Sequence, residues 1–212
     1  MSPPFADRIA AGRALAPHLT ALGLHRPLLV GLARGGVPVA AAAAAALGGG
    51  AEVDVGVARK ITAPDRPEAG LGAVAVDGEP VWFDRAVEHS GLDPEALAAA
   101  VAAERAEARR RELAYGAGWR AAAPGRDVVL VDDGIATGVT VVAALGSALA
   151  VGPARVVLAT PVAAPVALER IAGVWDGTVV AVLAPEDFRA VSDVYGDFGQ
   201  LTDDDVRRVL GR

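Results

Sequence analysis

The stretch from residue 128 to residue 140 constrains the fold of this chain more than any other. Residues 128–131 form an unbroken apolar run, which is typical of a strand buried on both faces of a parallel sheet. Asp132 and Asp133 follow at the end of that strand, and a turn of small residues then leads into a helix expected over residues 139–150. Open α/β sheets bind ligands beyond the carboxyl ends of their strands, so this stretch predicts a parallel sheet and a binding site.

The turn after the two acids has the chemistry of an anion site. Its small residues leave backbone N–H groups bare, Thr137 and Thr140 add hydroxyls, and the following helix points the positive end of its dipole at the turn. Such a site suits a phosphate. The two carboxylates beside it would repel a phosphate, but they suit hydroxyl groups or a metal carried by the ligand. A phosphate pocket next to two hydroxyl acceptors describes a sugar phosphate.

Residues 128–140 resemble the phosphoribosyl-pyrophosphate (PRPP) motif of type I phosphoribosyltransferases, in which four apolar residues and two acids precede a turn ending Thr-Gly-x-Thr. The resemblance implies that Asp132 and Asp133 hold the 2- and 3-hydroxyls of the ribose. The chain departs from the family at Gly134, where an aliphatic residue is usual. It also has Ala136 where some purine enzymes of the family place a proton-transferring Asp and others have Ala, so the motif supplies no catalytic base. The residues implied to bind the 5-phosphate are Gly134, Ala136, Thr137, Gly138, Val139 and Thr140.

The composition excludes several classes of protein. The 212 residues are 53% hydrophobic, which suffices for a single domain over residues 1–212, and no cysteine is present to form a disulfide or bind a metal. A net charge of −6 argues against broad nucleic-acid binding. The longest apolar run, residues 39–47, is too short to span a membrane, and residues 1–4 lack the features of a signal peptide. We therefore expect a cytoplasmic protein with no membrane or nucleic-acid partner.

Strand-like and helix-like segments alternate along the chain, which predicts an α/β fold with a mainly parallel sheet flanked by helices. A helical pattern over residues 5–23 contains Pro17, which should kink or split the helix. Asp77-Gly78-Glu79 predicts a β-hairpin between two short strands. Residues 62–70 and 115–126 are expected to be loops. Further strands are expected at 27–32, 52–58, 155–160 and 178–183, and further helices at about 37–47, 93–113, 163–172 and from a Thr202–Asp205 capping box onward.

A second phosphate-type loop follows the first expected strand. It reads Ala33-Arg34-Gly35-Gly36, and its glycines allow backbone conformations that other residues avoid, while the guanidinium of Arg34 suits phosphate. On its own this segment is better explained as a plain strand-to-helix turn with a solvated arginine. The family resemblance implies the other reading, because phosphoribosyltransferases bind pyrophosphate with a loop at this point, frequently through a non-proline cis peptide. Arg34, Gly35 and Gly36 are therefore expected to bind pyrophosphate.

Lys60 is the only lysine in a chain that otherwise uses arginine for its cations, which suggests that this position needs an ammonium group. A surface lysine is the alternative. Arg59 and Lys60 stand near a strand end and are similar to the basic pair that some family members place near the pyrophosphate. Both are expected to bind pyrophosphate, and Lys60 is the better candidate. The candidate catalytic residues are thus Arg34, Lys60, Asp132 and Asp133.

Residues 62–125 are longer than the flexible loop that the family carries ahead of its central motif, and we expect them to form an insertion with a hairpin and a helix. Arg105, Arg109, Arg110 and Arg111 share that helix with three glutamates. Glu107 and Arg111 have i,i+4 spacing, which favours a solvated, salt-paired face. The alternative is a mobile arginine arm over the pyrophosphate.

The C-terminal segment, residues 185–212, is expected to form a small hood over the edge of the sheet. Phe188 lies where family members face the base, and its ring can stack on a planar heterocycle. The alternative for an aromatic residue here is a core contact, which is the expected role of Phe198. Residues 191–205, together with the Arg-Gly-Gly and Arg-Lys segments, resemble a group of uncharacterised bacterial phosphoribosyltransferase-like proteins.

The resemblance implies a phosphoribosyltransferase, which transfers the 5-phosphoribosyl group of PRPP to a nucleobase-like nitrogen and releases pyrophosphate. It implies that Mg²⁺ arrives bound to PRPP, and no pair of histidines has the spacing of a metal site, so we expect no metal held directly by the protein. A non-catalytic regulatory protein that binds PRPP or a nucleotide is the main alternative, and a hydrolase of phosphoribosyl compounds is a third. A homodimer is common in the family. The sequence leaves the acceptor open.

Overall fold

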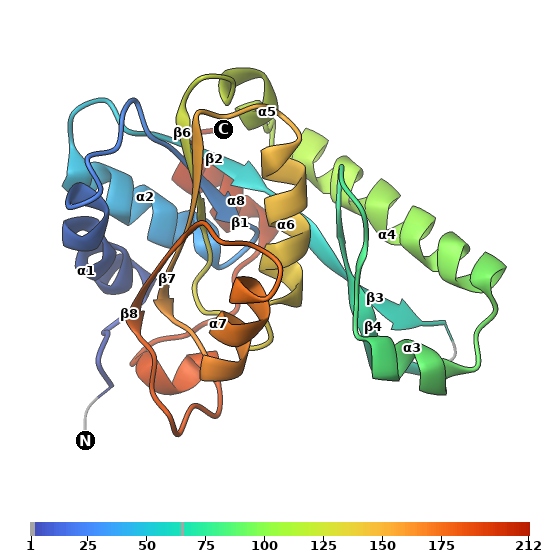
Figure 1. The fold of residues 1–212 in the computed structure, drawn as a ribbon. Helices are drawn as coiled ribbons and strands as arrows, with labels where there is room; N and C mark the ends of the chain where they lie inside the picture. The colour runs from blue at the N-terminus through green and yellow to red at the C-terminus, as the bar shows by residue number, and fades with distance from the viewer. Residues whose placement is uncertain (1–2, 65) are drawn as a thin grey trace.

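The computed structural model describes residues 3–64 and 66–212, and its centre is a five-stranded parallel sheet. The strand order is β2-β1-β6-β7-β8, and helices cover both faces of the sheet (Figure 1). The expected α/β fold with a mainly parallel sheet is confirmed. The strands are β1 (Leu28–Leu32), β2 (Glu52–Gly56), β6 (Asp127–Val131), β7 (Arg155–Val162) and β8 (Thr178–Leu183).

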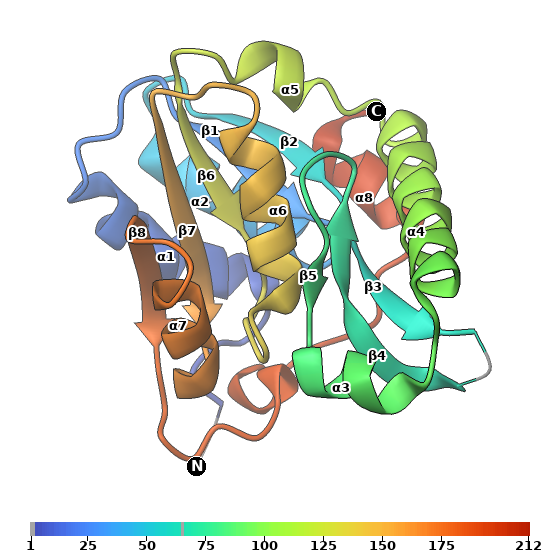
Figure 2. The same cartoon turned by 45° about the vertical axis from the view of Figure 1, so that its right-hand side comes forward.

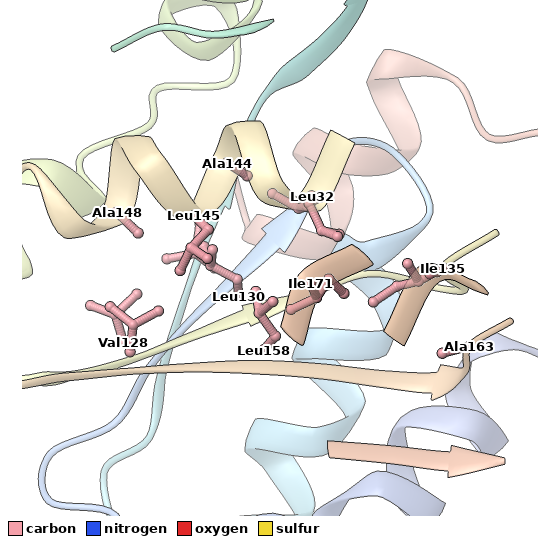
Figure 3. Packing of buried hydrophobic residues seen from close by; sticks show 14 of the residues in the cluster. Leu32, Val128, Leu130, Ile135, Ala144, Leu145, Ala148, Leu158, Ala163 and Ile171 are labelled. Atoms are coloured by element: carbon pink, nitrogen blue, oxygen red, sulfur yellow. The ribbon is translucent and has the colours of Figure 1, made fainter. Parts of the chain in front are cut away.

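Alternate side chains of the strands enter two separate cores. Leu29, Val129 and Val157 pack against α1 (Arg8–Thr20) and α2 (Gly36–Leu47). The intervening residues pack against α6 (Val139–Leu149) and α7 (Pro165–Ala172) on the opposite face (Figure 3). Because both faces of the sheet are covered, β6 is apolar from Val128 to Val131 instead of alternating.

The first helix is continuous where a kink or break was expected. α1 begins after Asp7, whose carboxylate accepts a hydrogen bond of 2.7 Å from Ala10 N, and it runs through Pro17 to Thr20. Of the two expected effects of Pro17, a kink or a split, the split does not occur. A proline removes one backbone donor, and here the loss falls in the last turn, where little helix remains to be disrupted.

The insertion forms a second, antiparallel sheet in the order β3-β4-β5. The hairpin expected around Asp77-Gly78-Glu79 joins β4 (Arg66–Ala75) to β5 (Val81–Trp82), and Gly78 has φ +86°. The expected loop over 62–70 is wrong in part, because β3 (Ala58–Ala63) pairs with the start of β4. Irregular register around Thr62 accommodates a segment rich in proline and glycine.

Three helices follow β5 in the insertion. α4 (Pro94–Ala114) begins as expected, with the Asp93 carboxylate accepting a hydrogen bond of 2.8 Å from Ala96 N. α3 (Asp84–Ser90) was not expected, and Gly91 ends it with φ +69°. α5 (Trp119–Ala122) lies inside the expected loop over 115–126 and corrects that expectation, because burial of the Trp119 side chain orders this turn against the core. The insertion lies beside α6, against which its Ala73, Val81 and Phe83 pack (Figure 2).

The chain after β8 returns across the carboxyl ends of the strands. Residues 185–202, which we call the C-terminal strap, contain the 3-10 helix η1 (Val191–Val194) and run from β8 to α8 (Asp203–Leu210) (Figure 2). Thr202 and Asp205 form the expected capping box. Val206 of α8 packs with residues of α2, β2 and α4. No helix among the described residues has both the length and the apolar character needed to span a membrane.

Candidate functional site

The two acids after β6 lie at the carboxyl edge of the sheet but point to different neighbours. Asp132 is half-buried and lines a cavity of about 180 Å³. Asp133 instead accepts a hydrogen bond of 2.8 Å at Oδ2 from Arg8 Nε, the closest contact of an ion pair. The first acid therefore faces the space that a ligand can enter, whereas the second is held by a side chain of α1.

Electrostatics also separate the two acids. Burial of the Asp132 carboxyl, reinforced by the neighbouring charge of Asp133, raises the pKa of Asp132 well above its usual value. The backbone N–H of Asp133 donates to Asp132 Oδ1 at 3.0 Å. This hydrogen bond lowers the pKa of Asp132, but its effect is smaller than that of burial and of the Asp133 charge. A hydroxyl donor or a cation in the cavity would stabilise the ionised carboxylate, so the site is suited to such a ligand.

The turn after the acids forms most of the cavity wall. Ile135 anchors the turn to β7, because its N–H donates to Val162 O at 2.9 Å and its carbonyl accepts from Ala164 N at 2.8 Å. Gly138 has φ +79° and immediately precedes α6, so the first N–H groups of that helix border the cavity. The lining residues are Lys60, Asp132, Gly134, Ile135, Ala136, Thr137, Gly138, Thr140 and Val141.

The structure accounts for the unusual glycine in the motif. A Cβ atom on Gly134 would lie 2.2 Å from Cγ1 of Val191 in η1. Val191 thus occupies the space that an aliphatic side chain would need at position 134. The Val191 side chain, which belongs to the C-terminal strap, thus takes the place of the aliphatic side chain that is usual at position 134.

The loop between β1 and α2 lies against the acids. The Ala33–Arg34 peptide bond is cis. A Cβ atom on Gly35 would lie 1.9 Å from Asp133 Oδ2, and one on Gly36 would lie 2.2 Å from the backbone oxygen of Val131. Only glycine permits this approach, so the two candidate phosphate loops meet at the end of β6. Arg34 makes a distant ion pair with Asp203, 3.5 Å between Nη1 and Oδ1.

Lys60 and Arg59 lie in β3, within the antiparallel sheet rather than at the end of β2 as expected. Although they are neighbours in the chain, their side chains have different surroundings. Lys60 is exposed and lines the cavity together with Asp132. The Arg59 side chain faces α4, where Nε donates to Glu104 Oε2 at 2.8 Å. The structure therefore brings Lys60 to the cavity and does not bring Arg59 there.

The arginines of α4 form the salt-paired face that their spacing favoured. Arg110 and Arg111 both pair with Glu107, at 2.6 and 2.7 Å. Arg105 donates to the backbone oxygens of Val76 and Gly78 and so attaches α4 to the hairpin turn. In this conformation the three arginines are occupied by contacts within the insertion and do not line the cavity.

Aromatic residues of the C-terminal strap pack on the body of the protein. The Phe188 side chain is half-buried against both the core under α7 and the cluster around Val162, and it is not among the residues that line the cavity. Phe198 stacks on Tyr195 at 4.8 Å between ring centroids, as expected for a core contact. Tyr195 donates from its hydroxyl to the backbone oxygen of Asp133 at 2.6 Å.

Sequence reasoning missed Arg8, Val191 and Tyr195 as neighbours of the site. Arg8 pairs with an acid far along the chain, and an arginine in the first turn of a surface helix carries no signal of such a contact. The departure at Gly134 was the signal that could have pointed to Val191, since a missing side chain in a packed motif requires a replacement from elsewhere.

The described residues contain no group of three or more His, Cys, Asp or Glu side chains arranged to hold a metal ion. Asp132 is the carboxylate that lines the cavity, and its raised pKa shows that a nearby positive charge would be favourable. This donor set fits a Mg²⁺ ion that is carried by a ligand and contacted from one side.

The sequence model of the phosphoribosyl transferase domain matches residues 6–194 of the chain. The chain belongs to this family. This phosphoribosyl transferase domain places its acid pair and small-residue turn at the carboxyl end of a central parallel strand. The family match spans both candidate phosphate loops and Lys60.

Sequence and structure comparisons agree with this assignment. Two proteins from Mycobacterium tuberculosis strains, both named "putative phosphoribosyl transferase", are each 41% identical over 209 residues, which is 98% of this chain. The chain spans 46% of the length of each of these relatives. The crystal structure of TT1426 from Thermus thermophilus is 45% identical, with a TM-score of 0.77 over 97% of both chains. The same fold thus extends over nearly the whole chain.

Proposed function

We propose that this phosphoribosyl transferase domain is a PRPP-dependent enzyme that moves the 5-phosphoribosyl group to a nucleobase-like nitrogen and releases pyrophosphate. The observation that carries the proposal is the cavity at the end of β6, which the small-residue turn, Asp132 and Lys60 line together. The glycine loop after β1 touches Asp133 at the same edge. A sugar that bears a phosphate and a pyrophosphate would meet all of these groups at once.

Each group has a role in this proposal. The turn from Gly134 to Thr140 binds the 5-phosphate, and Asp132 and Asp133 accept hydrogen bonds from the ribose hydroxyls. Arg34, Lys60 and the backbone of the Gly35-Gly36 segment bind the pyrophosphate. Arg59 would have to leave Glu104 to join them, so the role falls to Lys60. Phe188 contacts the base through the part of its ring that is not buried.

The reaction forms a bond between the acceptor nitrogen and the anomeric carbon while the bond from that carbon to the pyrophosphate oxygen breaks, and the acceptor nitrogen gives up its proton to solvent. The bonding electrons leave with pyrophosphate, whose negative charge grows in the transition state. Arg34, Lys60 and the N–H groups of the glycine loop stabilise that charge. Mg²⁺ carried by PRPP would neutralise part of the pyrophosphate charge. The remaining contribution of the protein is the alignment of the two reactants.

A non-catalytic protein that binds PRPP or a nucleotide is the second candidate, and Ala136 is compatible with it. This residue lines the cavity at the position where some purine enzymes of the family carry an acid, so the loop offers the acceptor no proton-transfer group. A protein of this kind would use the same contacts to the phosphate, the ribose and the pyrophosphate.

Release of pyrophosphate from PRPP and Mg²⁺ distinguishes these functions. The assay is run with pooled purines, with pooled pyrimidines and with no acceptor. The proposal predicts release that requires one of the pools and is strongly reduced in Lys60→Met. Binding of PRPP without release in any mixture would favour the regulatory protein, and release without an acceptor would indicate a hydrolase.

A further inference from the structure

Arg8, the first residue of α1, lies outside both phosphate loops, yet its side chain reaches the acid pair. Its Nε donates to Asp133 Oδ2 at 2.8 Å, and its Nη1 donates to the backbone oxygen of Gly199 at 2.9 Å. The guanidinium carbon lies 3.9 Å from the centroid of the Phe198 ring. Only 12% of the Arg8 side chain and 15% of the Asp133 side chain are exposed. A guanidinium held by three partners has a fixed orientation, and it fixes the carboxylate that it binds.

The backbone around Arg8 is attached to the C-terminal strap. Phe5 N donates to Val194 O at 2.9 Å, and Gly196 N donates to Phe5 O at 2.8 Å. Asp7 then caps the helix that Arg8 begins. The position of the guanidinium is therefore set by main-chain pairing between the two ends of the chain, and it does not depend on the long side chain alone.

Asp133 is enclosed from the other side as well. The carboxylate lies so near Gly35 that a Cβ atom there would come within 1.9 Å of Oδ2. The hydroxyl of Tyr195 donates to the backbone oxygen of the same residue at 2.6 Å. Arg8 and Gly35 thus lie on two sides of the Asp133 carboxylate and limit its movement.

The positive charge of Arg8 affects how the acid pair interacts with an anionic ligand. Two adjacent carboxylates repel each other, and together they repel a ligand that carries a phosphate and a pyrophosphate. Arg8 supplies one positive charge in contact with the pair, which makes the net charge of this group of side chains less negative by one unit. The pair then retains acceptors for hydroxyl groups at a smaller electrostatic cost to an anionic ligand.

We propose that Arg8 is a positioning residue for the ribose site, which orients the Asp133 carboxylate against the Gly35 loop and neutralises one of the two adjacent acids. This inference rests on the proposed function, because PRPP is the ligand whose ribose the acids would hold. Arg8 acts through Asp133 and does not itself contact the ligand.

The first experiment is calorimetric titration of Mg²⁺-loaded PRPP into the wild type, Arg8→Met, Arg8→Lys and Arg13→Met. Arg13 is the matched control, because it lies exposed on α1 and makes no hydrogen bond or ion pair with the described residues. Loss of a charge-assisted hydrogen bond should weaken binding by roughly 10–100-fold in Arg8→Met. Arg8→Lys should recover part of the affinity, since lysine keeps the charge but not the fork, and Arg13→Met should bind as the wild type does.

A second set of variants distinguishes positioning from structural support. If Arg8 acts through Asp133, the double variant Arg8→Met/Asp133→Asn binds PRPP as weakly as Asp133→Asn alone. Additive losses would overturn this route. A lower melting temperature with an unchanged dissociation constant in Arg8→Met would make Arg8 structural and leave the proposed function standing. Absence of PRPP binding by the wild type would overturn both.

Discussion

At the scale of single residues, Asp132 and Asp133 are adjacent in the sequence but have different neighbours in the structure. Asp132 lines the cavity with a raised pKa, and Asp133 is paired with Arg8. The motif identifies the two acids, but it does not show which side chains contact each of them. Arg8, which pairs with Asp133, is 125 residues away in the sequence. The acids were expected to act alike, whereas in the structure Asp132 lines the cavity and Asp133 is held by Arg8.

Replacement of Asp132 by Asn should stabilise the protein at neutral pH. A carboxyl with a raised pKa in the folded state stabilises the fold below its unfolded-state pKa, and this contribution is lost as the pH rises through the folded-state value. Above the unfolded-state pKa, the raised pKa of Asp132 therefore costs folding free energy, and Asn, which does not titrate, removes that cost. We expect the melting temperature to rise by about 3 °C, which corresponds to ~1 kcal/mol, and the gain to vanish near pH 4. A lower melting temperature for Asp132→Asn at pH 7.5 would contradict the burial argument.

Gly134→Ala tests the replacement of a motif side chain by Val191. The new methyl group would lie 2.2 Å from Val191 Cγ1, so overpacking should destabilise the protein by about 1–3 kcal/mol in urea denaturation. Val191→Gly removes the obstructing atoms. The double variant should lose less stability than the sum of the two single variants, and simple additivity would show that the two positions do not compete for space.

Lys60→Met and Arg59→Met compare two neighbouring cations of one strand. Lys60 lines the cavity, whereas Arg59 is paired with Glu104. We expect Lys60→Met to weaken pyrophosphate binding by roughly tenfold or more and Arg59→Met to weaken it by much less, in parallel calorimetric titrations. An equal loss of pyrophosphate affinity in the two variants would show that Arg59 also binds pyrophosphate.

At the scale of secondary-structure elements, one ion pair within the insertion also makes the hydrogen bonds that join the insertion to the body of the protein. Arg120 of α5 pairs with Glu112 of α4, and it donates to Asp77 in the hairpin turn at 2.7 Å and to Ser147 of α6 at 3.0 Å. The Glu112 carboxylate also accepts from Val57 N at 2.9 Å, between β2 and β3. The insertion is thus positioned by polar contacts that converge on one arginine.

Arg120→Met should destabilise the protein by about 3 kcal/mol or more, because Glu112 would remain buried without its ionic partner. Arg110→Met is the matched control. Its ion pair with Glu107 is exposed, so the loss should stay below about 1 kcal/mol. Urea denaturation measures both, and a loss in Arg120→Met as small as that in the control would mean that other contacts position the insertion.

The sequence predicted the elements that are specified locally. Residues 128–140 indicated β6, the acids, the turn and the start of α6, because strand burial and turn chemistry depend on neighbouring residues. The extension of β3 and β4 through 62–70 was missed, since its register depends on cross-strand pairing with irregular steps. α3 was also missed, although Gly91 after its last residue was an available end signal.

At the scale of the whole molecule, the site is assembled at one edge of the sheet from segments far apart in the chain. β1 and β6 supply the two loops, β3 supplies Lys60, α1 supplies Arg8 and the C-terminal strap supplies Val191 and Tyr195. The sequence indicated the first three contributions through motif and composition. The last two depend on how the ends of the chain meet, which no local pattern records.

Titration of Mg²⁺-loaded PRPP into the purified protein tests the central claim most directly. The account predicts saturable binding at one site per chain, weakened by Lys60→Met because Lys60 lines the same cavity as the candidate phosphate loop. Ribose 5-phosphate should compete with PRPP but bind more weakly, since it lacks the pyrophosphate. Absence of PRPP binding to the folded wild-type protein would contradict the account.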